Sequence, residues 1–164
     1  MVKHRLKHRA GCILILNKEG DHFLSVSGKS GKDFNLPGGK IEYNESYIDG
    51  SIRELREETG LIVNKRDLKL LHQNFDIGRG LRWYVITYIA FDWYGTIHTE
   101  ETGIVKWLPL EELKNSQKWE VYNTKVYENY MNKYNFTENK KNVYIPPHKR
   151  VNYFTKINRQ IFNY

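Results

Sequence analysis

Residues 39–61 read GKIEYNESYIDGSIRELREETGL. Within this stretch Glu54, Glu57 and Glu58 are spaced i, i+3 and i+4, so a helix would carry all three carboxylates on one face. Like charges on one helical face repel, and hard oxygen ligands at this density suit Mg²⁺ or Mn²⁺. Taken alone, three glutamates favour a solvated acidic face balanced by nearby arginines, so the surrounding sequence has to decide between the two interpretations.

A helix is predicted over residues 45–59, with Gly60 as its stop, since glycine commonly follows the last turn of a helix. Four residues at steps of four, three and four mark its buried face: Ile48, Ile52, Leu55 and Thr59. Gly50 lies inside this helix, where glycine costs about 1 kcal/mol relative to alanine. Either another element approaches closely there, or the helix tolerates the cost.

Apolar and β-branched runs on both sides of the helix predict five strands: residues 10–16, 22–26, 68–75, 83–93 and 104–108. Alternate positions from Trp83 to Phe91 form one side of the fourth strand. A hairpin turn is predicted over residues 78–80, and helical segments are expected over residues 109–113 and 119–134. Strands and helices mixed in this way indicate an α/β protein.

The length of 164 residues fits one domain with a short appendage. We expect a basic N-terminal arm or first strand over residues 1–9, a globular domain over 10–134, and a basic, aromatic-rich tail over 135–164. The net charge of +7 gathers at the two ends, which carry four and six Lys or Arg residues against no acid and one. Such ends could meet a polyanion such as RNA, or could serve solubility alone.

Cellular location is indicated by what the chain lacks. No uncharged run approaches the roughly 20 residues of a membrane span, and the N-terminus has no apolar signal stretch. The single Cys12 cannot close an internal disulfide. It sits in an apolar run, which favours a buried small hydrophobe over a reactive thiol. We therefore expect a soluble, cytoplasmic protein with no membrane partner.

The wider pattern resembles the signature of the Nudix (MutT-like) hydrolases at every specified position: Gly39-x5-Glu45-x7-Arg53-Glu54-Leu55-x-Glu57-Glu58-x-Gly60-Leu61. Such a match arises by chance at on the order of 10⁻⁹ per starting point. Residues 36–42 look like the usual lead-in of this family, and residues 105–113 like the strand and helix that commonly follow. The resemblance covers about residues 8–134 and implies a Nudix α/β/α sandwich around a mixed β-sheet.

The resemblance also implies hydrolysis of a nucleoside diphosphate linked to another group X, with Mg²⁺ or Mn²⁺ neutralising the phosphates and activating water. It implies that Glu57 and Glu58 are the principal metal ligands and that Glu54 is a further ligand or the base. Gly39 would add its backbone carbonyl. Arg53 would orient the glutamates through salt bridges.

Other carboxylates have roles that the resemblance only suggests. Glu45 would steady the Arg53 network from the start of the helix. In several members of the family the base or an extra ligand comes from a loop acid before the late tryptophan strand. Glu100 and Glu101 occupy that region. We favour Glu101 over Glu100 as the loop residue that serves as the base or as an extra metal ligand.

Substrate contacts are harder to assign from the residues. Five aromatic residues could stack on a base, although aromatics at strand spacing more often belong to the core: Phe34, Trp83, Tyr84, Tyr88 and Trp107. Arg79 and Arg82 could pair with phosphate oxygens or could be ordinary loop charges. We select Phe34, Arg82 and Trp107 as the substrate-binding candidates.

The leading function is cleavage of a small nucleotide, such as a nucleoside triphosphate, a dinucleoside polyphosphate or a nucleotide sugar. The alternative is RNA 5′-end processing, meaning mRNA decapping or pyrophosphate removal, because aromatic and basic residues interleave in the tail as single-strand binding requires. A minor alternative is a nucleotide-binding module without catalysis. Dimerisation is common in the family, so the tail could also wrap a second subunit of a homodimer.

Overall fold

The computed structural model describes residues 8–78, 80–98 and 103–134. Its main sheet has four strands in the order β3-β1-β5-β4, with bounds Gly38–Lys40, Arg9–Ile15, Leu81–Ala90 and Lys69–Gly78. β1 and β5 are parallel, whereas β3 pairs with β1 and β4 pairs with β5 in antiparallel fashion. A second, two-stranded antiparallel sheet joins β2 and β6, with bounds His22–Gly28 and Gly103–Pro109. The main sheet is therefore mixed.

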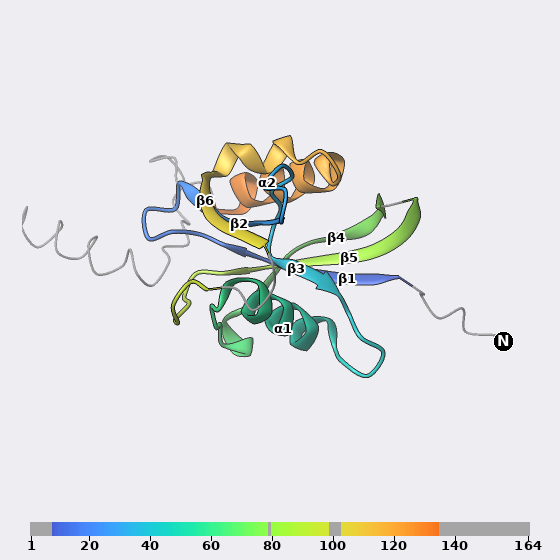
Figure 1. The fold of residues 1–164 in the computed structure, drawn as a ribbon, viewed down its shortest axis with the longest axis horizontal. Coiled ribbons are helices and arrows are strands. Elements are labelled where there is room, and N and C mark those ends of the chain that lie inside the picture. Colours follow the sequence, from blue (N-terminus) through green and yellow to red (C-terminus); the bar gives the residue numbers. More distant parts are fainter. Residues whose placement is uncertain (1–7, 79, 99–102, 135–164) are drawn as a thin grey trace, which may run out of the picture.

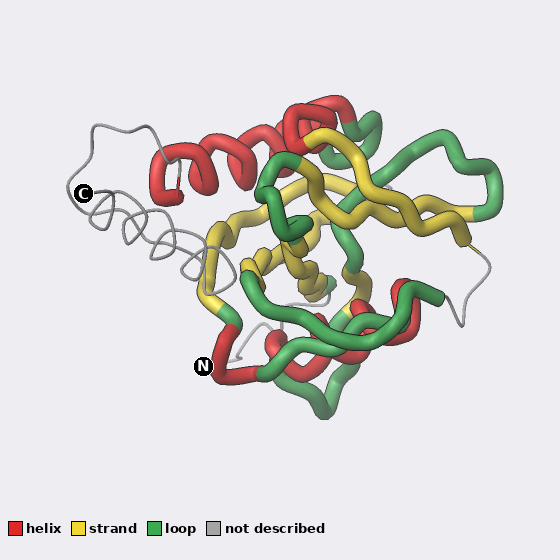
Figure 2. The backbone as a smooth tube through the Cα atoms, turned by 90° about the vertical axis from the view of Figure 1, so that its left-hand side faces the viewer, coloured by secondary structure: helices red, strands yellow, loops and turns green. Residues whose placement is uncertain are grey.

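Helices lie on both sides of the main sheet (Figures 1 and 2). α1 (Tyr47–Thr59) packs against β1 and β3, and α2 (Glu120–Tyr134) packs against β4 and the 3-10 helix η2 (Leu110–Asn115). A second 3-10 helix, η1 (Lys65–Asp67), follows α1. This arrangement confirms the expected α/β/α sandwich around a mixed sheet.

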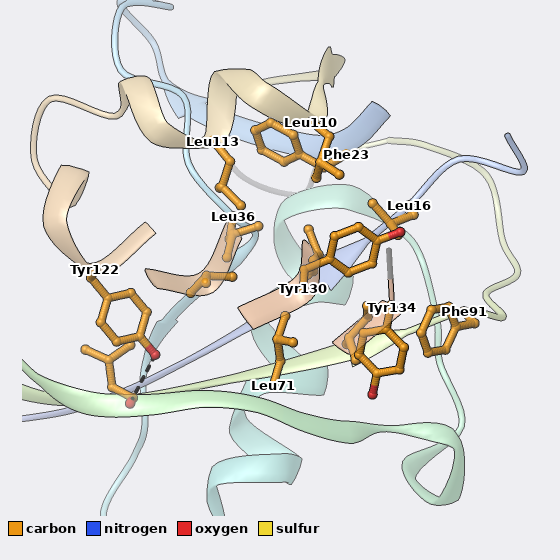
Figure 3. Packing of buried hydrophobic residues seen from close by; sticks show 14 residues of the cluster. Leu16, Phe23, Leu36, Leu71, Phe91, Leu110, Leu113, Tyr122, Tyr130 and Tyr134 are labelled. Atoms are coloured by element: carbon orange, nitrogen blue, oxygen red, sulfur yellow. Dashed lines mark hydrogen bonds between the residues drawn. The ribbon is translucent and has the colours of Figure 1, made fainter. Parts of the chain in front are cut away.

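Burial on both faces of β1 creates the two cores. Leu14 and Leu16 point to the α2 side, where they join Val126 and the tyrosines of α2 (Figure 3). Ile13 and Ile15 point to the α1 side, into the cluster that contains Leu55. Alternate residues of a strand face opposite sides of its sheet. A strand covered on both faces thus reads as a continuous apolar run.

The local signals around α1 explain its bounds. Ser46 caps the helix by accepting a hydrogen bond from the backbone N–H of Asp49. Gly60 ends it in the left-handed conformation at φ 75°, where a residue with a side chain is strained. The helix thus begins two residues later than the predicted start at residue 45. The predicted buried face is confirmed, because these residues are buried or pack partly buried against the α1-side core: Ile48, Ile52, Leu55 and Thr59.

Gly50 is explained by a close approach. A Cβ atom at this position would lie 2.6 Å from Ile41 Cδ1 and 2.7 Å from Glu45 Oε1. The loop that precedes α1 therefore folds back onto the helix at this point, and a side chain there would displace the ends of the Ile41 and Glu45 side chains. Of the two explanations that the sequence left open, the close approach is the one observed.

Three sequence expectations need adjustment. The glycine-rich strand β3 was not expected, because it has little strand propensity and forms only by pairing with β1. β5 ends at Ala90 rather than at residue 93. Tyr88 and Ala90 lie on the opposite face of the strand from the predicted side, and they are buried too. The predicted strand over 68–75 extends to Gly78.

Some expectations fall on residues outside the described part of the chain: residues 1–7, Arg79, Glu100, Glu101 and the tail from residue 135. The proposed domain limits at residues 9 and 134 therefore stay predictions. Among the described helices, none combines the length and the apolar surface that crossing a membrane would require.

Candidate active site

The glutamate-bearing face of α1 lies against Gly38 and Gly39, the first two residues of β3. The backbone N–H of Gly38 donates a hydrogen bond to Glu58 Oε2 at 2.7 Å. A Cβ atom on Gly39 would lie only 2.6 Å from the Glu54 carboxylate, so only glycine lets this carboxylate approach the backbone so closely. The tertiary structure thus brings Glu54, Glu58 and Gly39 together.

Arg53 is the centre of the carboxylate network. Its Nη1 donates hydrogen bonds to Glu54 Oε1 and Glu57 Oε2, each at 2.9 Å. Its Nη2 donates to Glu45 Oε1 at 2.7 Å and to the carbonyl of Lys40 at 3.0 Å. One guanidinium therefore holds two of the helix glutamates and ties them to the loop before the helix.

Within this network, the pKa values of Arg53 and Glu45 shift so as to favour the charged form of each. The hydrogen bonding of Arg53 to the Glu45 carboxylate, which accepts, is the largest of the effects that raise the pKa of Arg53 above its ordinary value. In return, the hydrogen bond from Arg53 is the main cause of the lowered pKa of Glu45. The side chains of Glu54 and Glu57 are only 14% and 28% exposed. Arg53 alone pairs with three carboxylates, those of Glu45, Glu54 and Glu57.

The donors suit a hard divalent cation. Glutamate oxygens on one helix face and the Gly39 carbonyl beside them are all hard oxygen ligands. Within residues 8–78, 80–98 and 103–134, no three or more Asp, Glu, His or Cys side chains converge as a ready metal cage. Mg²⁺ is usually held by one or two carboxylates together with water and substrate phosphates. The described residues fit that mode of binding.

A cleft of about 450 Å³ opens beside Glu58, the one of these carboxylates that lines it. Its wall contains Glu58 and residues 38–40. The same wall contains the aromatic residues Trp83, Trp119 and Tyr122. Four polar side chains also contribute to the wall: Asp33, Asn35, Lys118 and Asn123. The volume lies within the range of small-molecule sites, about 300–1,000 Å³.

The floor of the cleft is uncharged. Tyr122 donates a hydrogen bond to the carbonyl of Val85 at 3.2 Å (Figure 3), and its hydroxyl lies 2.9 Å from Thr87 Oγ1. Cys12 Sγ lies 3.2 Å from the same Thr87 oxygen. Burial raises the pKa of Cys12 to about 11, so the thiol is neutral at physiological pH. Cys12 is only half-buried and lines the cleft, so the expected buried position is not what the structure shows, whereas a neutral thiol agrees with the expectation that it is not reactive.

The three substrate-binding candidates chosen from the sequence do not line the cleft. Trp107 is paired with the buried Leu24 and packs 5.7 Å from Trp93 in the α1-side core, since cross-strand partners share a face. Arg82 lies over the ring of Phe75. Because neighbours on a strand face opposite sides, Arg82 points away when Trp83 faces the cleft.

Phe34 is also turned to a partner outside the cleft. The ammonium group of Lys106 lies 3.9 Å from the centre of the Phe34 ring. Its two sequence neighbours, Asp33 and Asn35, are the residues that line the cleft. Sequence reasoning missed both of these, and also Trp119 and Asn123. The available signal was position in the sequence. Asp33 and Asn35 lie just before the two glycines of β3, and Trp119 and Asn123 lie at the start of α2.

The family model described as NUDIX domain matches residues 6–130. YvcI, an uncharacterised Nudix hydrolase of Bacillus subtilis, is 34% identical over 84 residues, covering 48% of this chain and 52% of the relative. An 8-oxo-dGTP diphosphatase of Buchnera aphidicola is 32% identical over 85 residues, covering 49% of this chain and 59% of the relative. The chain thus spans between half and three fifths of these two relatives.

A solved structure with the same fold comes from a study of MutT from Aliivibrio salmonicida and Vibrio cholerae. The TM-score is 0.59 at 21% sequence identity, and the match covers 73% of this chain and 98% of that one. At this level of identity the similarity establishes the fold alone. It agrees with the mixed sheet and the two helical layers described above.

Proposed function

The chain belongs to the Nudix family, and on this basis we propose that it is a hydrolase that cleaves the phosphoric anhydride of a small nucleotide, with the help of a divalent metal ion. The substrate would be a nucleoside diphosphate linked to a group X. One observation carries the proposal: the same cleft is lined by Glu58 of α1 and by the aromatic residues Trp83 and Trp119. Such a cleft suits a molecule with a polyphosphate at one end and a base at the other.

The orientation of the nucleotide follows from charge and stacking. Indole rings bind bases by stacking, which is worth about 1–3 kcal/mol per base in single-strand binders. The phosphates would lie toward residues 38–40, which share the cleft wall with Glu58. The scissile anhydride would then face Glu54, Glu57 and Glu58.

The metal would be held by Glu57, Glu58 and the Gly39 carbonyl. When bound, Mg²⁺ or Mn²⁺ supplies charge neutralisation for the phosphates and lowers the pKa of the attacking water. Arg53 is a positioning residue, because it holds Glu54 and Glu57 in place without facing the cleft wall. Glu54 would accept the proton of the water, with Glu101 as the alternative base from the loop.

The chemical identity of X divides the possible substrates. Similarity to an 8-oxo-dGTP diphosphatase supports a nucleoside triphosphate, which would yield a nucleoside monophosphate and pyrophosphate. Dinucleoside polyphosphates and nucleotide sugars fit the same chemistry. RNA 5′-end processing is the second candidate, supported by the six basic residues of the segment from residue 136 to the end.

A product survey tests the proposal. Purified protein with Mg²⁺ is incubated with a panel of nucleotides and with 5′-capped and 5′-triphosphorylated RNA, and products are separated by chromatography. Release of a monophosphate from a free nucleotide supports the main proposal, and selective action on RNA ends supports the second candidate. Binding without turnover of any member would indicate a non-catalytic module and overturn the enzymatic proposal.

A further inference from the structure

A polar corner lies at one side of the cleft, where the segment before β3 meets the start of α2. Ser116 Oγ donates a hydrogen bond to Asn35 Oδ1 at 2.6 Å and lies 3.5 Å from Asp33 Oδ1. One hydroxyl thus contacts both side chains, which places them side by side. Both residues line the cleft. Trp119 is adjacent, since its backbone N–H donates to the same Ser116 hydroxyl.

The two carboxylate oxygens of Asp33 differ, because one accepts a backbone hydrogen bond and the other has no hydrogen-bond donor among the described residues. Its Oδ1 accepts a hydrogen bond from the backbone N–H of Gln117 at 3.1 Å. Its Oδ2 is buried and has no hydrogen-bond donor in the part of the chain that the structure describes. The nearest cation, Lys118 Nζ, lies 3.6 Å away on a side chain that is 59% exposed, whereas Asp33 is 12% exposed. A buried carboxylate oxygen without a donor is unfavourable unless a ligand supplies one.

Asn35 offers the complementary group. Its Oδ1 accepts hydrogen bonds from Ser116 and from the buried Asn123, so the amide oxygen is occupied. Its backbone is fixed by two hydrogen bonds to Val26, which hold the segment against β2. The NH₂ group is therefore the part of this amide that can serve a ligand. A ligand acceptor would suit Asn35 and a ligand donor would suit Asp33.

We propose that Asp33 is a specificity-determining residue that accepts a hydrogen bond from an N–H group on the nucleobase, with Asn35 as the neighbouring donor. The ligand is a base rather than a phosphate, because a carboxylate repels phosphate and Trp119 lies beside this corner. A base edge with an N–H group beside an acceptor satisfies both side chains. The inference deepens the proposed function and rests on it for the identity of the ligand as a nucleotide.

The structural alternative is that Asp33 only holds the loop to α2, through Gln117 and the ion pair with Lys118. Two variants separate the roles. Asp33→Asn keeps an oxygen for the Gln117 N–H and replaces the oxygen facing the ligand with a donor. Lys118→Gln breaks the ion pair but leaves the carboxylate in place.

The experiment compares nucleotides that differ only in the base. GTP and ATP carry N–H groups on the base, and purine riboside triphosphate carries none. For Asp33→Asn, kcat/KM for the better of GTP and ATP should fall by about 10- to 100-fold, while kcat/KM for purine riboside triphosphate changes less than about threefold. Lys118→Gln should preserve the ratio between the two kinds of substrate. An equal loss on all three substrates, or the same loss of discrimination in Lys118→Gln, would overturn the proposal.

A binding measurement on the unaltered protein gives an answer even if Asp33→Asn fails to fold. Trp83 and Trp119 line the cleft, so tryptophan fluorescence should report occupancy. GMP or AMP should bind at least about tenfold more tightly than purine riboside monophosphate. Equal affinities would contradict the assignment. If no triphosphate is hydrolysed the proposed enzymatic function fails, whereas this binding ratio still tests whether the cleft recognises an N–H group on the base, which the role of Asp33 requires.

Discussion

Arg53 donates two hydrogen bonds to Glu45, from Nη2 to Oε1 at 2.7 Å and from Nε to Oε2 at 3.2 Å. Glu45 precedes α1, and Arg53 lies in its second turn. The pair therefore ties the loop before the helix to the face that carries the glutamates. The other terminal nitrogen of Arg53 binds Glu54 and Glu57. A change that weakens the contact between Glu45 and Arg53 should therefore disturb the positions of Glu54 and Glu57.

Glu45→Gln should lower kcat by about tenfold, because a neutral amide binds Arg53 less tightly and Arg53 then positions the helix glutamates less accurately. A tenfold loss corresponds to about 1.4 kcal/mol in the activation free energy. Steady-state kinetics on the substrate found by the product survey measures it. Asp49→Asn is the matched control, since Asp49 also lies on α1 but forms an exposed ion pair with Lys65 of η1. The control should leave kcat within about twofold. Equal effects of the two substitutions would remove the positioning role of Glu45.

Glu57→Gln should reduce turnover by about 100-fold or more while the fold persists, because one charged ligand is lost from a site that works by charge neutralisation. Circular dichroism and thermal melting check the fold. Near-normal rates in a well-folded variant would exclude Glu57 as a ligand. If Glu54→Gln loses less activity than Glu101→Gln, the base belongs to the loop rather than to the helix.

Hydrolysis should require added Mg²⁺ or Mn²⁺ and should rise between about pH 6 and pH 9, because the attacking water must lose a proton. A pH–rate profile at saturating metal measures this, and a chelator titration measures the metal requirement. Full activity in excess chelator would contradict a metal-dependent mechanism.

Acid should weaken the link between Glu45 and Arg53. The folded pKa of Glu45 is lowered, chiefly by the Arg53 hydrogen bond, so its contribution to stability is present above the unfolded pKa. That contribution is lost as the pH falls through the folded pKa. The difference in melting temperature between the parent and Glu45→Gln should therefore shrink as pH falls below about 4. A constant difference between pH 7 and pH 3 would show that the charge of Glu45 is not involved.

Removal of residues 136–164 distinguishes the two candidate substrates. If RNA is the substrate, the truncated protein should bind single-stranded RNA far more weakly and lose several units from the slope of log affinity against log salt, because counterion release scales with cationic contacts. Its activity on a free nucleotide should persist. Cooperative melting near the parent temperature must first establish that the truncated protein folds. Unchanged RNA processing by a folded truncated protein would exclude the tail from RNA recognition.

Local sequence determined much of the fold. The spacing of Ile48, Ile52, Leu55 and Thr59 predicted the buried face of α1, because burial on a helix follows its period of about 3.6 residues. Gly60 predicted the end of that helix. These features depend on residues within a few positions of one another, so the local sequence is enough to predict them. The motif over residues 39–61 identified the family by the same kind of local information.

The cleft wall depended on the tertiary structure. Trp107 and Trp83 are both aromatic residues on strands, yet only Trp83 lines the cleft, because the register with Leu24 turns Trp107 into the α1-side core. Asp33 and Trp119 come from segments far apart in the sequence and meet only when α2 docks beside the loop that precedes β3. Sequence periodicity identifies which residues share a face of one element. Which faces enclose a cavity is set by strand register and by the packing of distant elements, and no single element carries that information.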